Sequence, residues 1–156
     1  AWAKPDAKHK FQTKHPIAQN AIQLQQGTVM DLYPTILSVA HVKSPKHYVL
    51  DGADLKKLLQ GKEDKNHRDD FLMHFPHGEH RANYFTTYRK GDWKLIYYYN
   101  PETTGIPTWK LYNLKDDPYE TSELSAKYPE KAASMIELMK KRLTEENALY
   151  PITENK

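Results

Sequence analysis

Four short runs rich in aromatic residues, between positions 71 and 113, constrain the fold more than any other feature of this sequence. They cover residues 71–75, 83–90, 93–99 and 109–113. Aromatic and β-branched side chains suit the half-buried surface of a sheet, so each run is predicted to be a strand. Only Gly91 and Asp92 separate the second run from the third, which indicates a tight hairpin turn with a positive φ at Gly91.

A single amphipathic helix is predicted after these strands. Pro129 suits the first turn of a helix, and Lys and Glu residues occupy the face opposite the apolar one. The apolar positions recur at helical spacing: Ala132, Met135, Ile136, Met139 and Leu143. Residues 68–156 are therefore expected to form an α+β subdomain, in which a four-stranded antiparallel sheet is packed by a C-terminal amphipathic helix over residues 129–147.

The first 67 residues have a different character. Residues 4–26 are polar and interrupted by Pro5 and Pro16, which predicts a surface loop. Apolar residues at helical spacing predict a buried helix over residues 28–40, in which Pro34 requires a kink or a late start. A short helix over residues 54–60 follows, and Gly61 ends it.

The composition narrows the classes of partner and site. Lys and Arg number 23 against 20 Asp and Glu, and the net charge of +3 is too small and too scattered to indicate nucleic-acid binding. No run approaches the ~20 consecutive apolar residues of a membrane span. The absence of cysteine excludes disulfides, thiolate zinc sites and cysteine nucleophiles. Because the chain opens at Ala1 and only 38% of its residues are hydrophobic, we expect its start to be internal to a longer chain.

Four segments occur in an order and at distances that match a known family. They are residues 29–37 (VMDLYPTIL), 50–61 (LDGADLKKLLQG), 89–96 (RKGDWKLI) and 111–120 (LYNLKDDPYE). Together they resemble the C-terminal portion of the sulfatase family, in the alkaline-phosphatase-like superfamily. Asp54 stands where the family usually has Ser. The resemblance covers most of the chain, and it implies an enzyme that hydrolyses sulfate esters, with glycans among the expected substrates.

The resemblance also implies where the chemistry lies. In this family the nucleophile is a formylglycine, made from Cys or Ser in a Cys/Ser-x-Pro-x-Arg motif, and a calcium ion is held by Asp and Asn side chains. None of the five serines here has Pro two residues on and Arg four on. Both cofactors, and every catalytic residue, are therefore expected in the parent enzyme upstream of this chain. The chain alone is expected to be inactive.

The same resemblance also implies what surrounds this chain in the intact enzyme. Residues 1–67 would be the C-terminal edge of the α/β catalytic domain, and the helix over residues 28–40 would expose Leu32, Ile36 or Leu37, because it packs on a sheet that lies elsewhere. The implied partners are the N-terminal catalytic portion of the same enzyme and a sulfated small molecule or glycan, and neither nucleic acid nor membrane. A periplasmic, secreted or lysosomal location is typical of the family.

Residues 74–81 (HFPHGEHR) form the one dense polar cluster of the sequence. Three histidines at steps of three would suggest a zinc site on a helix, but Pro76 and Gly78 prevent that helix. Relatives often carry a His/Tyr-x-Pro-x turn near the catalytic pocket, which makes His74, His77 and Arg81 the candidate substrate-binding residues. An imidazole can donate to sulfate oxygens or sugar hydroxyls, and a guanidinium adds a planar fork. A solvated loop at a strand end is the alternative.

Two other functions stay open at this point. A phosphatase-like or phosphonate-cleaving relative of the same superfamily would have a similar tail. A free-standing carbohydrate-binding module would use the aromatic rows, residues 97–99 with Trp93 and Trp109, although strand alternation directs about half of such side chains into a core.

Three carboxylates lie within five residues: Asp116, Asp117 and Glu120. Oxygen ligands so close in sequence could hold a hard cation. An Asp-Pro-x-Glu turn explains them more simply, because Asp side chains accept hydrogen bonds from nearby backbone N–H groups and Pro118 fixes its own φ. We expect a structural turn here.

Overall fold

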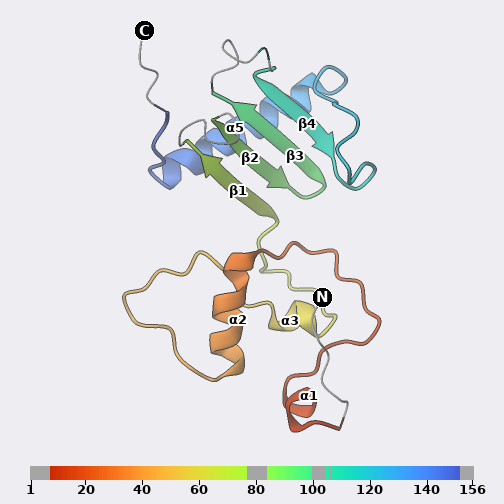
Figure 1. Ribbon diagram of the computed structural model, residues 1–156, viewed down its shortest axis with the longest axis vertical. Coiled ribbons are helices and arrows are strands. Elements are labelled where there is room, and N and C mark those ends of the chain that lie inside the picture. Colours follow the sequence, from red (N-terminus) through yellow and green to blue (C-terminus); the bar gives the residue numbers. More distant parts are fainter. Residues whose placement is uncertain (1–7, 77–83, 100–104, 106, 152–156) are drawn as a thin grey trace. The chain divides into compact units, whose positions relative to one another are not determined.

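The chain divides into two compact units, Ala1–Arg68 and Asp69–Lys156, which are described one at a time (Figure 1). The computed structural model describes residues 8–76, 84–99, 105 and 107–151. Among these residues, no helix is both long enough and apolar enough to cross a membrane.

The second unit contains a four-stranded antiparallel meander. Its strands are β1 (Asp70–Phe75), β2 (Phe85–Lys90), β3 (Trp93–Tyr98) and β4 (Trp109–Asn113), in the spatial order β1-β2-β3-β4. Beyond the end of β3, the amide of Tyr99 still donates to the carbonyl of Tyr84. The predicted four-stranded sheet is confirmed, with the first predicted residue of the second strand, position 83, outside the described residues.

The β2–β3 hairpin is closed by Gly91 and Asp92, as the sequence predicted. Lys90 pairs with Trp93, so the loop has two residues, and Gly91 has a φ of 56°. Asp92 has no positive φ, and this combination of signs is that of a type II′ turn, whose twist matches that of the strands. The positive φ explains the glycine, because a β-carbon would be strained there.

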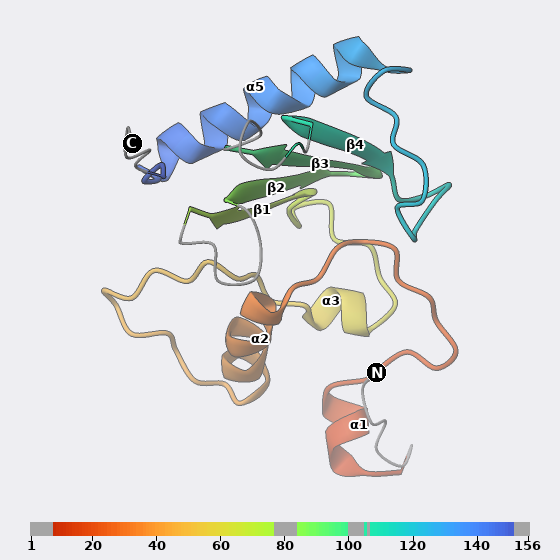
Figure 2. The ribbon, with the colours of Figure 1, turned by 45° about the horizontal axis from the view of Figure 1, so that its top comes forward.

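Helix α5 (Pro129–Glu145) covers one face of the sheet (Figure 2). Alternation along each strand directs every second side chain toward the helix, and the apolar stripe of the helix packs against them. The core residues from β2, β3, β4 and α5 are each 9% exposed or less: Tyr88, Leu95, Leu111, Ala132, Met135, Ile136, Met139 and Leu143. This packing confirms the predicted α+β fold of the C-terminal subdomain.

The end of α5 reverses the direction of the chain. Asn147 has a φ of 51°, its amide donates to Thr144, and the amide of Ala148 donates to the carbonyl of Leu143 at 2.9 Å. This is the Schellman pattern, in which a left-handed residue after the helix satisfies the last carbonyls. Ala148 packs against the core as a result, and the segment that follows is directed back toward the sheet.

The described residues of the first unit, 8–68, form four short helical elements. They are α1 (Lys10–Lys14), the 3₁₀ helix η1 (Val29–Asp31), α2 (Leu32–Val39) and α3 (Lys56–Leu59). Pro34 is the third residue of α2, a position whose N–H would have no partner within the helix. Proline therefore costs no hydrogen bond there, and the helix starts late and is not kinked. The prediction of an uninterrupted loop over residues 4–26 was wrong, because α1 lies within it. His9 caps that helix by accepting the amide of Phe11.

The apolar side of α2 is largely exposed. Leu32 is 37% exposed and Ile36 is 58% exposed, whereas Leu37 is half-buried. The expectation that this helix exposes apolar side chains is confirmed for the first two residues.

A buried carboxylate, Asp31, organises the first unit. It accepts hydrogen bonds from the amide of Thr28 at 2.6 Å and the amide of Ala53 at 2.8 Å, and it pairs with the guanidinium of Arg68. The loop that carries Ala53 approaches closely, since a β-carbon on Gly52 would lie 2.0 Å from the carbonyl oxygen of Met30. These bonds tie together three segments that are distant in the sequence.

The protonation of Asp31 is set by the same contacts. Burial alone would raise its pKa, but the amides of Ala53 and Thr28 and the guanidinium of Arg68 outweigh burial and hold the pKa below the ordinary value of 3.8. A lowered pKa in the folded state means that the ionised form stabilises the fold. That contribution is present above about pH 3.8 and is lost as the pH falls through the folded-state pKa.

We predict that Asp31→Asn lowers the free energy of unfolding of the first unit at pH 7 by about 1.5 to 3 kcal/mol, the range for hydrogen bonds to a charged group. The variant should also lose part of the acid sensitivity below about pH 4. Hydrogen exchange of the Ala53 and Leu55 amides, measured by NMR from pH 3 to pH 7, reports both effects. Asp54→Asn is the matched control, because that carboxylate is exposed and caps only Lys56. Equal exchange in both variants would contradict the role given to Asp31.

Candidate functional site

The predicted substrate-binding residues lie at and after the end of β1. His74 is the fifth residue of β1, opposite Thr86 of β2, on the face of the sheet that also carries the core residue Leu72. His77 and Arg81 fall outside the described residues. The part of the site that can be described is therefore the strand end around His74.

Both ring nitrogens of His74 have partners. Nδ1 lies 2.7 Å from the hydroxyl of Thr86, and Nε2 lies 2.6 Å from the backbone carbonyl of Leu149. A carbonyl can only accept, so Nε2 must carry the hydrogen and donate it. In the neutral imidazole Nδ1 then accepts from Thr86, and this assignment of the tautomer follows from the partners.

The hydroxyl of Thr86 links His74 to Tyr99. Thr86 is fully buried, and its hydroxyl lies 2.6 Å from that of Tyr99. Because Thr86 gives its hydrogen to His74, it accepts one from Tyr99. Burial raises the pKa of Tyr99, which the hydrogen bond to Thr86 only partly offsets, so the phenol stays protonated and can donate. The three side chains form one directed chain of hydrogen bonds.

Aromatic rings surround this chain. Tyr99 contacts Tyr97 and Tyr150 with ring centroids 5.4 and 5.8 Å apart, and His74 contacts Tyr150 at 6.0 Å. All three pairs meet edge to face, the arrangement that aromatic quadrupoles favour. No sequence pattern pointed to Tyr150 or Leu149, because only the reversal after α5 brings them to β1.

The carboxylates of residues 116–120 serve a turn. Asp117 accepts from the amide of Ser122 at 2.9 Å and the hydroxyl of Thr121 at 3.1 Å, and the Ser122 amide is the main reason why its pKa is lowered. Glu120 has a φ of 58° and pairs with Lys94. Within the described ranges no group of three or more His, Asp or Glu side chains is placed to hold a metal ion.

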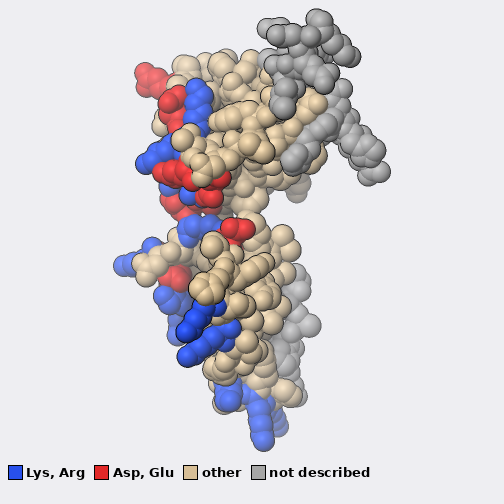
Figure 3. All heavy atoms as spheres, turned by 90° about the vertical axis from the view of Figure 1, so that its left-hand side faces the viewer, with Lys and Arg blue, Asp and Glu red and all other residues tan. Residues whose placement is uncertain are grey.

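The face of the sheet opposite α5 is hollowed. A depression of about 610 Å³ is lined by apolar side chains such as Phe71 and Met73 and by the charged side chains of Arg89, Lys94 and Glu120. Elsewhere on this unit, Lys and Arg lie beside Asp and Glu, as Figure 3 shows for the visible side, and α5 itself carries ion pairs such as Lys140 with Glu137. The side of the second unit that Figure 3 shows has no large patch of a single charge sign.

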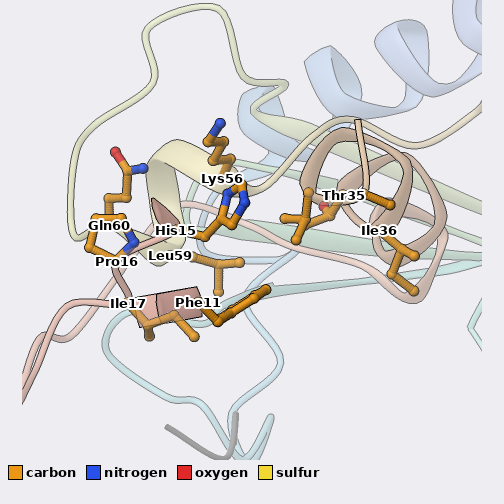
Figure 4. Close-up of a pocket in the computed structure, with 11 residues that line it drawn as sticks. Phe11, His15, Pro16, Ile17, Thr35, Ile36, Lys56, Leu59 and Gln60 are labelled. Atoms are coloured by element: carbon orange, nitrogen blue, oxygen red, sulfur yellow. The ribbon is translucent and has the colours of Figure 1, made fainter. Parts of the chain in front are cut away.

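A second hollow, of about 600 Å³, lies in the first unit (Figure 4). Phe11, Ile17, Ile36 and Leu59 make its lining apolar. His15 is 9% exposed there, and its Nδ1 has no hydrogen-bond partner within the described part of the chain. Burial, with smaller effects from nearby Lys56 and other cationic groups, lowers the pKa of His15 and favours the neutral ring.

Comparisons with known proteins place this architecture in a family. The family model described as N-sulphoglucosamine sulphohydrolase, C-terminal, matches residues 8–148. An uncharacterised sulfatase of Schizosaccharomyces pombe is 34% identical over 70% of this chain and 20% of its own length, and a sulfatase of Formosa agariphila is 33% identical over 74% and 22%. The chain therefore spans about a fifth of the length of these curated relatives.

Solved structures agree on the fold. The protein BT4656, in complex with its substrate D-glucosamine-2-N,6-O-disulfate, superposes with a TM-score of 0.57 at 29% identity, over 73% of this chain and 23% of that one. A 2-O glycosaminoglycan sulfatase, BT1596, superposes with a TM-score of 0.59 at 23% identity, over 75% and 24%, and supports the fold alone.

A four-stranded meander under one helix, preceded by the helical unit that the same family model spans, is the C-terminal architecture of sulfatases. This chain belongs to the family of N-sulphoglucosamine sulphohydrolase C-terminal domains.

We predict that Thr86→Val destabilises the second unit by about 1 to 3 kcal/mol, because it leaves the buried Nδ1 of His74 and the hydroxyl of Tyr99 without their shared partner. Thr87→Val is the matched control, since Thr87 is the next residue on the opposite, hollowed face of the sheet. Valine favours strands there, so the control should change stability little. Urea unfolding followed by the fluorescence of Trp93 and Trp109 measures both. A control as unstable as Thr86→Val would refute the explanation.

Proposed function

We propose that this chain is the C-terminal part of an enzyme that hydrolyses sulfate esters. The observation that carries the proposal is the family match over residues 8–148, which spans both units in one continuous alignment. The sulfatases of Schizosaccharomyces pombe and Formosa agariphila support it from separate comparisons.

The nucleophile and the metal are assigned to another part of the parent enzyme. The sequence has no cysteine, and none of its five serines lies in a Ser-x-Pro-x-Arg motif, so no residue here fits the precursor of formylglycine. Among the described residues no group of acidic side chains is placed to hold calcium: Asp31 is occupied by amides and Arg68, and Asp117 by its own turn. No chemical step is therefore assigned to this chain.

The contribution proposed for this chain is to substrate binding. His77 and Arg81 follow β1 within a few residues, and loops at strand ends commonly hold binding side chains on a rigid scaffold. A guanidinium binds sulfate oxygens in pairs, and an imidazole donates to sulfate or to sugar hydroxyls. His74 stands at the base of the same segment. Direct contact of His74 with substrate stays a prediction, and it would require the ring to release Thr86 or Leu149.

Sulfated amino sugars are the substrate class that we propose. The solved relative of 29% identity holds D-glucosamine-2-N,6-O-disulfate, and the matching family is described by N-sulphoglucosamine. Such a ligand offers anionic sulfate groups and a polar ring, which suits cationic and hydrogen-bonding side chains better than the apolar hollow of the first unit.

The N-terminal catalytic portion of the same enzyme is the proposed partner of the first unit. The exposed side chains of Val29, Tyr33 and Ile36 and the apolar hollow beside α2 are surfaces that a packing partner would cover. A polar group of that partner would satisfy Nδ1 of His15, which has no hydrogen-bond partner among the described residues.

We predict that the 156-residue chain alone does not hydrolyse 4-methylumbelliferyl sulfate, with or without calcium, whereas the full-length parent enzyme does. A fluorimetric assay on both proteins, at equal molar concentration, measures this. Turnover by the chain alone would contradict the assignment of the nucleophile. A parent enzyme that cleaves a phosphonate or phosphate monoester faster than the sulfate would contradict the proposed reaction.

We predict that His77→Ala and Arg81→Ala in the full-length enzyme each lower kcat/KM for a sulfated glucosamine by about tenfold, the effect of losing ~1.4 kcal/mol of transition-state binding. Arg81→Lys should recover only part of the loss, because an ammonium keeps the charge but not the fork. The matched control is His47→Ala, which removes an exposed histidine of the first unit. Unchanged kinetics in both alanine variants would remove these residues from the substrate site.

A further inference from the structure

We propose that His74 is a positioning residue that clamps the chain after α5 to the end of the sheet. The clamp is the hydrogen bond from Nε2 of His74 to the carbonyl of Leu149, at 2.6 Å, between residues 75 positions apart. This inference concerns the chain itself and does not depend on the proposed reaction.

The end of α5 delivers Leu149 to this position. Asn147 adopts the left-handed conformation, and Ala148 is then fixed twice, by its amide bond to Leu143 and by its contact with the core. The carbonyl of Leu149, the next residue, therefore has little conformational freedom. The side chain of Leu149 is 81% exposed and buries little surface, so it is the backbone hydrogen bond to His74 that anchors this residue.

The imidazole of His74 is held in place independently of its bond to Leu149. Nδ1 is held by the buried hydroxyl of Thr86, which accepts in turn from Tyr99. The ring therefore presents Nε2–H in one direction, and little rotamer entropy remains to be lost when the bond to Leu149 forms. Tyr150 then packs edge to face on both His74 and Tyr99.

The clamp gives a different reading of His74 from substrate contact. A clamp needs only a donor at the place of Nε2. Glutamine puts an amide nitrogen near that place, whereas asparagine ends near the place of Nδ1 and cannot reach Leu149. The pair His74→Gln and His74→Asn therefore tests whether a donor at this place holds the residues after α5.

The first test needs no variant. Nitrogen-15 chemical shifts of the His74 imidazole in the full 156-residue chain, near pH 7.5, should show hydrogen on Nε2, and backbone relaxation should show ordered amides at Leu149 and Tyr150. Order parameters near 0.85 describe a rigid backbone, and values below about 0.6 describe a flexible one. Hydrogen on Nδ1, or flexible amides at both residues, would overturn the clamp even if every variant failed to fold.

The second test uses the two variants. His74→Gln should keep the amides of Leu149 and Tyr150 ordered, and His74→Asn should bring their order parameters below about 0.6. Methyl signals of Leu95 and Leu111 check that the core is intact in each. Equal order in the two variants would overturn the proposal.

Discussion

The packing of α5 on one face of the meander is the contact on which the second unit rests. Leu95, Leu111 and Tyr88 supply the sheet side of that core, and Met135, Met139 and Leu143 supply the helix side, each almost fully buried. Apolar burial of this kind is the largest favourable term in folding. It fixes the register of the strands, because a slip by one residue would turn these side chains away from the helix.

The position of His74 follows from that register. Once Leu72 faces the helix, His74 must face the same side at the end of β1, opposite Thr86. The same core sets the length of α5, and the Schellman turn after it returns Leu149 and Tyr150 to the strand end. His74, Thr86 and Tyr99 thus form a polar network at the edge of the apolar core. Their donors and acceptors are paired with one another and with the carbonyl of Leu149, which apolar packing would not achieve.

The first unit depends on a different interaction. Few of its large apolar side chains are buried, and Leu55 and Leu58 are its buried aliphatic residues within the described ranges. Asp31 compensates by joining η1, the loop at Ala53 and the end of the unit at Arg68. A unit held by a buried ion pair, with exposed apolar surface on α2, has the character of a piece that packs on a larger body.

The sequence by itself determined the sheet, the hairpin at Gly91, the helix from Pro129 and the family, because each is written in local periodicity, turn chemistry or motifs of adjacent residues. It also placed His74 in the first strand. Only the tertiary structure decided that Asp31 is buried against Arg68 and that His74 meets Leu149. Those contacts join residues up to 75 positions apart, and no local pattern specifies which distant backbone group will satisfy a given side chain.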